Sequence, residues 1–482
     1  MFNIYEKGKE LLKIISDGAK TAPTLKTIIE IELAEFLKSE KRERMLQGNA
    51  YYVGKHDIKG KTRSGYFPDG EKKPNSIIVD NQYKKMVDQK ANFIVGQPIA
   101  INTANETYSK LLNDIFNATI QKSRVKIARK MLNNGLSWVY LYINEAGALC
   151  SKVFPSEQML PFWKDDEHTE LDFIVRTYEI EVYEGKRKEI QRYVEVYSKS
   201  GIDYFVYSGG RLIEDVEKEH QAYFTITDKE TGEEQGYNWD KIPLIAFKYN
   251  ADELPLIINC KSVQDAINEL YSTMQDTMIE SSRSTILILK NYDGQDLTEF
   301  RRKLKENGVI KVRTISGVDG GVDSISIEFK PENHKTVLEM LKKSMVENCM
   351  GYDAKDDRIG SNANQMNIQS MYNDINLDAH GMETEMQTAL KNFLDIVNAY
   401  LYNAGYGDFS EESVEFVFNR DMMMNESEIM TMLINAGLQL SQQTLINQVP
   451  FVDDWKKEQE QIQEEQSKTA NDYKGLFANS EV

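Results

Sequence analysis

Cysteine and long apolar runs are scarce in this sequence, and each scarcity argues against a class of protein. The 482 residues include three cysteines, Cys150, Cys260 and Cys349, which lie far apart and form no Cys-x-x-Cys pattern. This spacing argues against a disulfide framework or a structural zinc site, and it fits a reducing compartment such as a cytoplasm. The first residues, MFNIYEKGKELLKII, lack the long apolar core of a signal peptide. No apolar run approaches the roughly 18 residues that span a bilayer, so we expect no membrane contact.

Recognisable catalytic motifs are missing as well. The five histidines are scattered, none in an HExxH arrangement, and no Gly-x-Ser-x-Gly elbow occurs. The stretch from Gly54 to Thr62 resembles a phosphate-binding loop, but five residues separate its glycines where four are needed, which favours a surface loop. Adjacent carboxylates such as Asp165 and Asp166 are expected by chance among 76 acidic residues. We therefore expect no catalytic residue, no metal site and no cofactor.

The acidic balance limits the possible partners. The formal net charge is −18 at pH 7, whereas proteins that wrap the outside of a duplex usually carry a basic face. The same charge is compatible with a passage through which DNA slides without sticking, because each neutralised phosphate would add affinity. It is equally compatible with a simpler role, the solubility of a large assembly.

Hydrophobic periodicity predicts several helices in the first part of the chain. Apolar residues recur at helical spacing from about Leu25 to Leu46, which predicts one charged amphipathic helix. A second helix is predicted over Asn81–Val95, where the following Gly-Gln-Pro ends it. Further helical patterns follow at Tyr108–Asn117 and Ser123–Asn134.

The remainder of the chain changes from strands back to helices, which predicts an α+β fold. From Ser137 to about Tyr249 the period is two, and we expect six to eight antiparallel strands. A helix is then predicted over Ile257–Ser281, with Val263, Ile267, Leu270 and Met274 in its apolar stripe. A compact insertion with a short basic helix at Asp296–Glu306 separates it from a second helix that begins at Pro331 and runs to about Met350. After a polar loop, a very long helix is predicted from about Gln365 to Ala404.

Two segments carry a family resemblance. YYVGKHDI (Tyr51–Ile58) and KPNSIIVDNQYKKMVDQKANFIVGQPIAI (Lys73–Ile101), together with the order of helix, insertion, helix, polar loop and long helix, resemble the SPP1-type portal protein family of siphophages. The resemblance covers roughly residues 25–405 and includes no catalytic fingerprint. It implies a non-enzymatic, ring-shaped channel at the capsid vertex, used for genome packaging, retention and ejection.

The resemblance also implies a portal fold with distinct regions. The chain would comprise a wing, a two-helix stem around a clip, a tunnel loop with a long helix behind it, and a crown. The implied boundaries are 1–255 for the wing, with N-terminal helices and an antiparallel β-rich part, 256–281 for stem helix 1, 282–330 for the small α/β clip, 331–350 for stem helix 2, 351–364 for the tunnel loop, 365–405 for the long wing helix, and 406–482 for the short helical crown and C-terminal tail.

Partners follow from the same resemblance. Copies of the chain would form a homo-oligomer, a dodecameric ring, through which double-stranded DNA passes. The clip would dock the terminase large subunit, which supplies ATP hydrolysis, and later the head-completion adaptor protein. Major capsid and scaffolding proteins would be further partners. The protein would reside at the portal vertex of the virion and, during assembly, in the host cytoplasm.

Charged residues provide candidate contact sites within these regions. Between Arg283 and Lys330 the net charge is +2, which favours docking of an acidic partner, although a solvated helix face explains it equally well. Lysines on stem helix 2 could form positive collars along the tunnel, but Glu339 shares their face and could pair with them. The predicted docking residues of the clip are Lys290, Arg301, Arg302, Lys303, Lys305, Lys311 and Arg313. The predicted DNA-facing residues are Lys335, Lys342 and Lys343 on stem helix 2 and Lys355, Asp356, Asp357 and Arg358 in the tunnel loop.

Two other classes of protein remain open. Another phage head or tail structural adaptor would have no central hole wide enough for duplex DNA. A metal-dependent DNA-processing enzyme would need carboxylates that converge on a cation, and sequence alone does not show such convergence.

Overall fold

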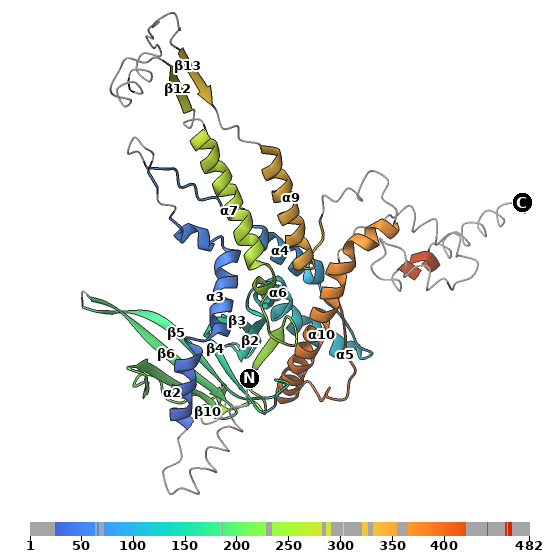
Figure 1. The fold of residues 1–482 in the computed structure, drawn as a ribbon. Coiled ribbons are helices and arrows are strands. Elements are labelled where there is room, and N and C mark those ends of the chain that lie inside the picture. Colours follow the sequence, from blue (N-terminus) through green and yellow to red (C-terminus); the bar gives the residue numbers. More distant parts are fainter. Residues whose placement is uncertain are drawn as a thin grey trace, which may run out of the picture. The chain divides into compact units, whose positions relative to one another are not determined.

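The structure is a computed structural model, and it describes most of the chain between Leu25 and Arg420 (Figure 1). The described residues are 25–62, 65–66, 72–185, 187–227, 234–281, 286–290, 302, 321–325, 331–353, 365–420, 441, 458–459 and 461–464. The chain divides into two compact units. The first comprises Met1–Met350 and Ala379–Arg420, and the second comprises Gly351–Asp378 and Asp421–Val482. The mixture of helices and antiparallel sheets is the expected α+β class.

The single helix predicted from Leu25 to Leu46 is wrong, because the structure has two helices there. Helix α2 spans Leu25–Phe36 and helix α3 spans Glu40–Tyr52. Ser39 separates them in an extended conformation, with its Oγ donating to the Phe36 carbonyl at 2.8 Å and accepting from the Arg42 N–H at 3.2 Å. The same hydroxyl therefore contacts the end of one helix and caps the start of the next.

The other N-terminal helices lie where the periodicity predicts them. Asn81 and Asn105 cap the starts of α4 and α5 through their side-chain oxygens. Gly135 ends α6 in the left-handed conformation, at φ 81°. The elements in this part are η1 (Asp57–Gly60), α4 (Gln82–Val95), β1 (Ala100–Asn102), α5 (Glu106–Ala118), η2 (Gln121–Ser123) and α6 (Arg124–Asn134).

The β-rich part contains ten strands among its described residues, more than the six to eight expected. Strands β8, β9 and β10 have only four residues each, too short for a two-residue period to be recognised. The strands are β2 (Leu136–Ile143), β3 (Leu149–Phe154), β4 (Met159–Trp163, preceded by η3, Ser156–Gln158), β5 (Leu171–Glu184), β6 (Arg187–Ser198), β7 (Gly201–Ser208), β8 (Arg211–Glu214), β9 (Phe224–Thr227), β10 (Glu234–Tyr237) and β11 (Leu244–Lys248). They form antiparallel sheets in the orders β11-β2-β3, β4-β5-β6-β7-β8 and β10-β9.

Helix α2 covers one face of the five-stranded sheet. Its buried Ile29, Leu33 and Phe36 belong to one apolar cluster with side chains of strands β4 to β8. The sheet residues of this cluster are Leu160, Phe162, Phe173, Val175, Val194, Val196 and Leu212. These residues alternate along the strands, so one side of the sheet is apolar and the helix lies against it.

Two helices follow the sheets and pack against each other (Figure 1). Helix α7 spans Ile257–Ser281 and helix α9 spans Pro331–Asn348, in agreement with the predicted ranges. Between them in sequence, β12 (Ile286–Lys290) pairs antiparallel with β13 (Gly321–Ile325). Of the basic helix predicted over Asp296–Glu306, only Arg302 lies within the described residues.

The long helix α10 spans Gln365–Asn403, as predicted, and it contributes to both units. Within the first unit its C-terminal part packs on α5, where Phe393 meets the ring of Phe116 edge to face and Asn398 accepts from the Tyr108 hydroxyl at 2.7 Å. The chain then forms β14 (Glu415–Val417), which pairs antiparallel with β1. Within the second unit, the Tyr372 ring of α10 contacts the Tyr352 ring.

Candidate functional site

Helix α9 carries Lys335, Lys342 and Lys343, which are predicted to face DNA, and one side of α7 carries an unexpected row of buried polar residues. We call this row the polar ladder. Its members recur every four residues and are all buried, at 0–7% exposure. They are Gln264, Asn268, Ser272 and Asp276. Because residues four apart lie on one side of a helix, the polar ladder forms a continuous stripe along α7.

The polar ladder binds the main chain of residues 76–83, which we call the strap and which comprise the segment before α4 and the first two residues of that helix. Backbone N–H groups of the strap donate to ladder side chains in antiparallel order: Ser76 to Asp276 Oδ1 (2.8 Å), Ile78 to Ser272 Oγ (3.0 Å), Asp80 to Asn268 Oδ1 (3.0 Å) and Tyr83 to Gln264 Oε1 (2.8 Å). Two residues of extended chain advance about 6.6 Å, and four residues of helix advance about 6 Å. The two repeats therefore match for Ser76, Ile78 and Asp80, which meet successive turns of α7, and the fourth contact comes from Tyr83 in the first turn of α4.

The two segments that carry the family resemblance are both anchored at this helix. The strap belongs to the second segment, and His56 belongs to the first. The buried His56 ring stacks on Tyr51 at 4.4 Å between centroids, and its Nδ1 lies 2.8 Å from the Asn268 amide nitrogen. Burial lowers the pKa of His56 below its ordinary value. A neutral imidazole suits this site, because its Nδ1 then accepts a hydrogen bond from Asn268.

A cluster of charged residues around Lys261 attaches the same first segment to α7. The Lys261 ammonium lies 2.6 Å from Asp57 and 2.8 Å from Asp265, and the Tyr51 hydroxyl donates to Asp265 at 2.6 Å. Burial opposes the charge of Lys261, but the hydrogen bonds to Asp265 and Asp57 outweigh it and raise its pKa. The hydrogen bond from Lys261 lowers the pKa of Asp57. Tyr51 of α3 and Asp57 of η1 are therefore both bound to α7, a contact that the sequence alone does not predict.

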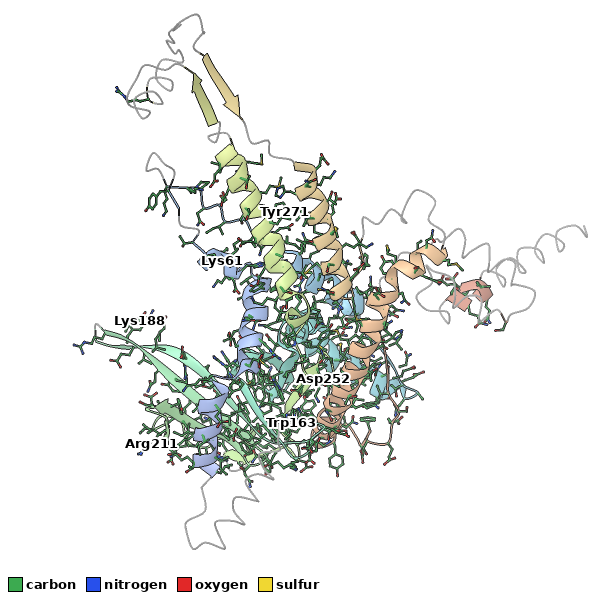
Figure 2. All side chains as sticks on the ribbon, viewed as in Figure 1. Lys61, Trp163, Lys188, Arg211, Asp252 and Tyr271 are labelled. Carbon is green, nitrogen blue, oxygen red and sulfur yellow. The ribbon has the colours of Figure 1, made fainter. Side chains whose placement is uncertain are left out.

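Lys342 lies on α9 but is bound within its own chain. Its ammonium is 2.9 Å from the Asp80 carboxylate and donates to the Tyr271 hydroxyl at 3.0 Å (Figure 2 labels Tyr271 on α7). Burial lowers the pKa of Lys342, but Asp80 and Tyr271 outweigh that effect and raise it above its ordinary value. The lysine therefore joins the strap, α7 and α9 at one point.

Lys335 and Lys343 are placed differently. Both are exposed on α9, and Lys343 lies 4.0 Å from Glu347 on the next turn. An exposed pair at this distance contributes little to stability, so the charge stays available to an external partner. Whether any of these three lysines faces DNA stays a prediction.

The two lysines support a matched stability test. Lys342→Met should lower the free energy of unfolding by about 1 kcal/mol, because it removes a partly exposed ion pair that solvent already screens. Lys343→Met should change it by no more than about 0.5 kcal/mol, since an exposed side chain is lost. Urea unfolding followed by circular dichroism measures both. Equal effects of the two substitutions would contradict the role given to Lys342.

Most of the remaining predicted contact residues lie outside the described part of the chain. This applies to Lys355, Asp356, Asp357 and Arg358 of the tunnel loop and to Arg301, Lys303, Lys305, Lys311 and Arg313 of the clip. Lys290 is the last residue of β12, and Arg302 is described and exposed. Their docking role stays a prediction.

Neither a metal site nor a membrane span is found in the part of the chain that the structure describes. There, no group of three or more His, Cys, Asp or Glu side chains could hold a metal ion. None of the described helices is both long and apolar enough to cross a membrane.

The fold and this site define an α+β protein organised around a helix pair, in which buried polar contacts hold a strap to the first helix. Comparison with known proteins identifies the family. The model described as "Phage portal protein, SPP1 Gp6-like" matches residues 37–472. The portal protein of Bacillus phage SPP1 is 27% identical to this chain over 489 residues, covering 98% of this chain and 93% of the relative. The portal protein of Clostridium phage phiCD119 is 24% identical over 455 residues, covering 90% and 96%.

The chain therefore belongs to the phage portal protein family. This membership confirms the family that the sequence resembles, and it assigns the chain a portal role in a phage capsid. The family is structural rather than enzymatic, which agrees with the expectation of a non-catalytic chain.

Proposed function

We propose that copies of this chain close into a ring in which α7 and α9 line a channel for double-stranded DNA. The observation that carries the proposal is the packing of α7 against α9, with β12 and β13 between them in sequence. The two helices pack along each other, and the pair of strands β12 and β13 lies between them in sequence. A circle of such subunits would place the same helices around a common axis.

Exposed apolar side chains on the helix pair support the proposal. Val337 and Met340 of α9 are 47% and 67% exposed, and Met278 of α7 is 47% exposed. Val263, Leu270 and Met274 of the predicted apolar stripe are only half-buried, whereas the polar ladder is fully covered. Exposed apolar side chains on packed helices are typical of a contact surface between proteins, and neighbouring subunits would cover them.

The remaining regions are proposed from family membership. Residues 1–255 and 365–405 would form the wing, 256–281 and 331–350 the stem, 282–330 the clip, 351–364 the tunnel loop and 406–482 the crown. The ring would be dodecameric and reside in the virion after assembly in the host cytoplasm. Its clip would dock a terminase large subunit and then a head-completion adaptor, with capsid and scaffolding proteins around it.

Negative-stain imaging of the purified protein tests the ring directly. We expect closed rings with a central hole of roughly 20 Å or more, the width needed for a DNA duplex. A discrete particle without a hole would instead favour another head or tail adaptor. Cleavage of DNA that depends on a divalent metal would favour a processing enzyme.

A pair of valine substitutions tests whether the helix pair forms the subunit contact. Val337→Asp should shift the protein from rings to monomers, because a charge would have to be buried between subunits. Val216→Asp is the matched control, since Val216 is 94% exposed in the loop after β8. Light scattering gives the mass of each, and thermal unfolding at low concentration shows whether the monomer still folds. Intact rings of folded Val337→Asp protein would place the subunit contact elsewhere.

A further inference from the structure

Strands β5 and β6 are longer than the strands beside them. Strand β4 pairs with β5 only as far as Arg176, and β7 pairs with β6 only from Arg192 onward. Beyond these points β5 and β6 pair with each other up to Glu184 and Arg187. We call residues 179–184 of β5 and 187–192 of β6 the ribbon, whose end carries Lys188 (Figure 2).

Both edges of the ribbon are open along the residues that the structure describes, except at Arg192, which pairs with Tyr207 of β7. A strand edge presents a row of backbone N–H and C=O groups that can pair with another chain, and natural proteins usually shorten, cover or pair such edges. A two-stranded ribbon is also marginal by itself in water. The length of this ribbon therefore indicates a partner for its edges.

The side chains of the ribbon indicate what kind of partner fits. The β5 edge is acidic, with the described side chains of Glu179 and Glu181 and no basic residue. The β6 edge is mainly basic, with Arg187, Lys188 and Arg192 against the single acidic Glu189. Within the chain these charges pair across the ribbon, as Lys188 does with Glu181 at 2.6 Å and Arg192 with Glu179. A second copy placed alongside would repeat the same match between acidic and basic strands.

Large apolar side chains are also exposed on the ribbon. Tyr183 is 69% exposed, Ile190 is 67% exposed and Ile180 is 42% exposed. The register places Tyr183 opposite Lys188 and Ile190 opposite Glu181, so Tyr183 and Ile190 lie on one face of the ribbon. A neighbouring ribbon would cover part of these side chains as well as the open edge.

We propose that ribbons of adjacent subunits pair edge to edge, with β5 of one copy against β6 of the next. Because β5 and β6 run in opposite directions, two ribbons laid side by side with the same orientation continue an antiparallel sheet. The contact uses two different edges, so it repeats head to tail and closes when the ring closes. This inference rests on the proposed ring.

Cysteine crosslinking between singly substituted chains tests the pairing. Glu181→Cys on β5 is assembled with an equal amount of chain carrying Glu189→Cys, Ile190→Cys or Gln191→Cys on β6, because the register within one ribbon places Ile190 at the height of Glu181. Paired strands bring opposite Cβ atoms close enough for a disulfide. At least one mixture should therefore shift to the mass of two chains on a non-reducing gel after mild oxidation. Glu217→Cys, an exposed glutamate in the loop after β8, replaces the β6 variant in the control mixture and should give no shift above the wild-type background.

The outcomes separate this inference from the proposed ring. Intact rings with a two-chain species in a β5–β6 mixture support both. If rings form but none of the three mixtures gives the two-chain species, the ribbon pairing is wrong and the proposed ring is unaffected. Absence of rings in the unsubstituted protein overturns the proposed function itself.

A charge exchange gives a second, independent test. Lysine replaces Glu179, Glu181 and Glu184, and glutamate replaces Arg187, Lys188 and Arg192. The exchanged chain keeps its internal ion pairs and should form rings by itself. When the exchanged chain is mixed with wild type, each should form rings with its own kind. A contact between β5 of one kind and β6 of the other would place like charges opposite each other. Native mass spectrometry of the mixture gives the number of exchanged and wild-type chains in each ring. Rings that contain both chains in random proportion would contradict edge pairing.

Discussion

Gln264→Leu is expected to lower the free energy of unfolding of the first unit by about 4 kcal/mol, because it leaves two or more buried polar groups without partners at about 1–3 kcal/mol each. The Gln264 side chain is fully buried. Its Oε1 accepts from the Tyr83 N–H at 2.8 Å, and its Nε2 donates to the Asp80 carbonyl at 2.7 Å. Leucine fills a similar volume but offers neither atom.

The matched control is another glutamine of the same helix. Gln275 is exposed on α7, and Gln275→Leu should change the free energy of unfolding by no more than about 0.5 kcal/mol. Urea unfolding followed by circular dichroism compares the two. Limited proteolysis gives a local readout, since loss of the ladder should expose the strap to cleavage in Gln264→Leu alone. Similar stability and protection in both variants would show that the ladder does not hold the strap.

Glu253→Gln is expected to destabilise the first unit by about 3–5 kcal/mol, the usual effect of removing one partner from a buried charge cluster. Glu253 is 3% exposed between β11 and α7. Its carboxylate is paired with Lys41, accepts a hydrogen bond from His168 Nδ1 at 2.7 Å and lies 3.6 Å from Lys248. The amide of glutamine has a similar shape, but it leaves the two ammonium groups without a negative partner.

Acid titration provides a second readout of the same cluster. Burial favours the neutral acid, but the hydrogen bond from His168 and the charge of Lys41 outweigh it and lower the pKa of Glu253 to about 2. The folded pKa is below the unfolded one, so the stabilisation is fully present above about pH 4.5 and is lost as the pH falls toward 2. It amounts to about 3 kcal/mol. Glu253→Gln should remove that part of the acid dependence, whereas the exposed Glu145→Gln should retain it. An unchanged acid profile in Glu253→Gln would contradict the assignment.

The helices of this fold are well predicted from sequence because their signals are local. The range of α7 follows from its apolar spacing, and α9 begins at Pro331 as expected for a first-turn proline. The break at Ser39 is missed because no glycine or proline marks it and apolar residues continue on both sides. The hydroxyl contacts that produce the break become visible only when both helices are in place.

The site is less predictable because its partners are distant in sequence. The polar ladder has a four-residue period, but polar residues at that spacing usually mark a solvent-facing side, so burial cannot be inferred from Gln264 or Asn268 alone. The lysines of α9 look equivalent in sequence. Lys342 differs from Lys343 through Asp80, which lies in the strap far earlier in the chain, and through Tyr271 of α7. The family resemblance pointed to the correct segments without showing what they contact.

The strap is recognised through its backbone, and this has a consequence for how its sequence can change. Ladder side chains contact amide groups of Ser76, Ile78 and Asp80, which every residue except proline provides. The side chain of Ile77 points away and is 44% exposed. Natural variants could therefore exchange the side chains at positions 76–78 and keep these hydrogen bonds, whereas Asp80 also pairs with Lys342 and Asn81 also caps α4. A single proline at position 76, 78 or 80 would remove one hydrogen bond to the ladder. Tolerance scanning of this segment should thus return a proline-specific pattern instead of a hydrophobicity-specific one.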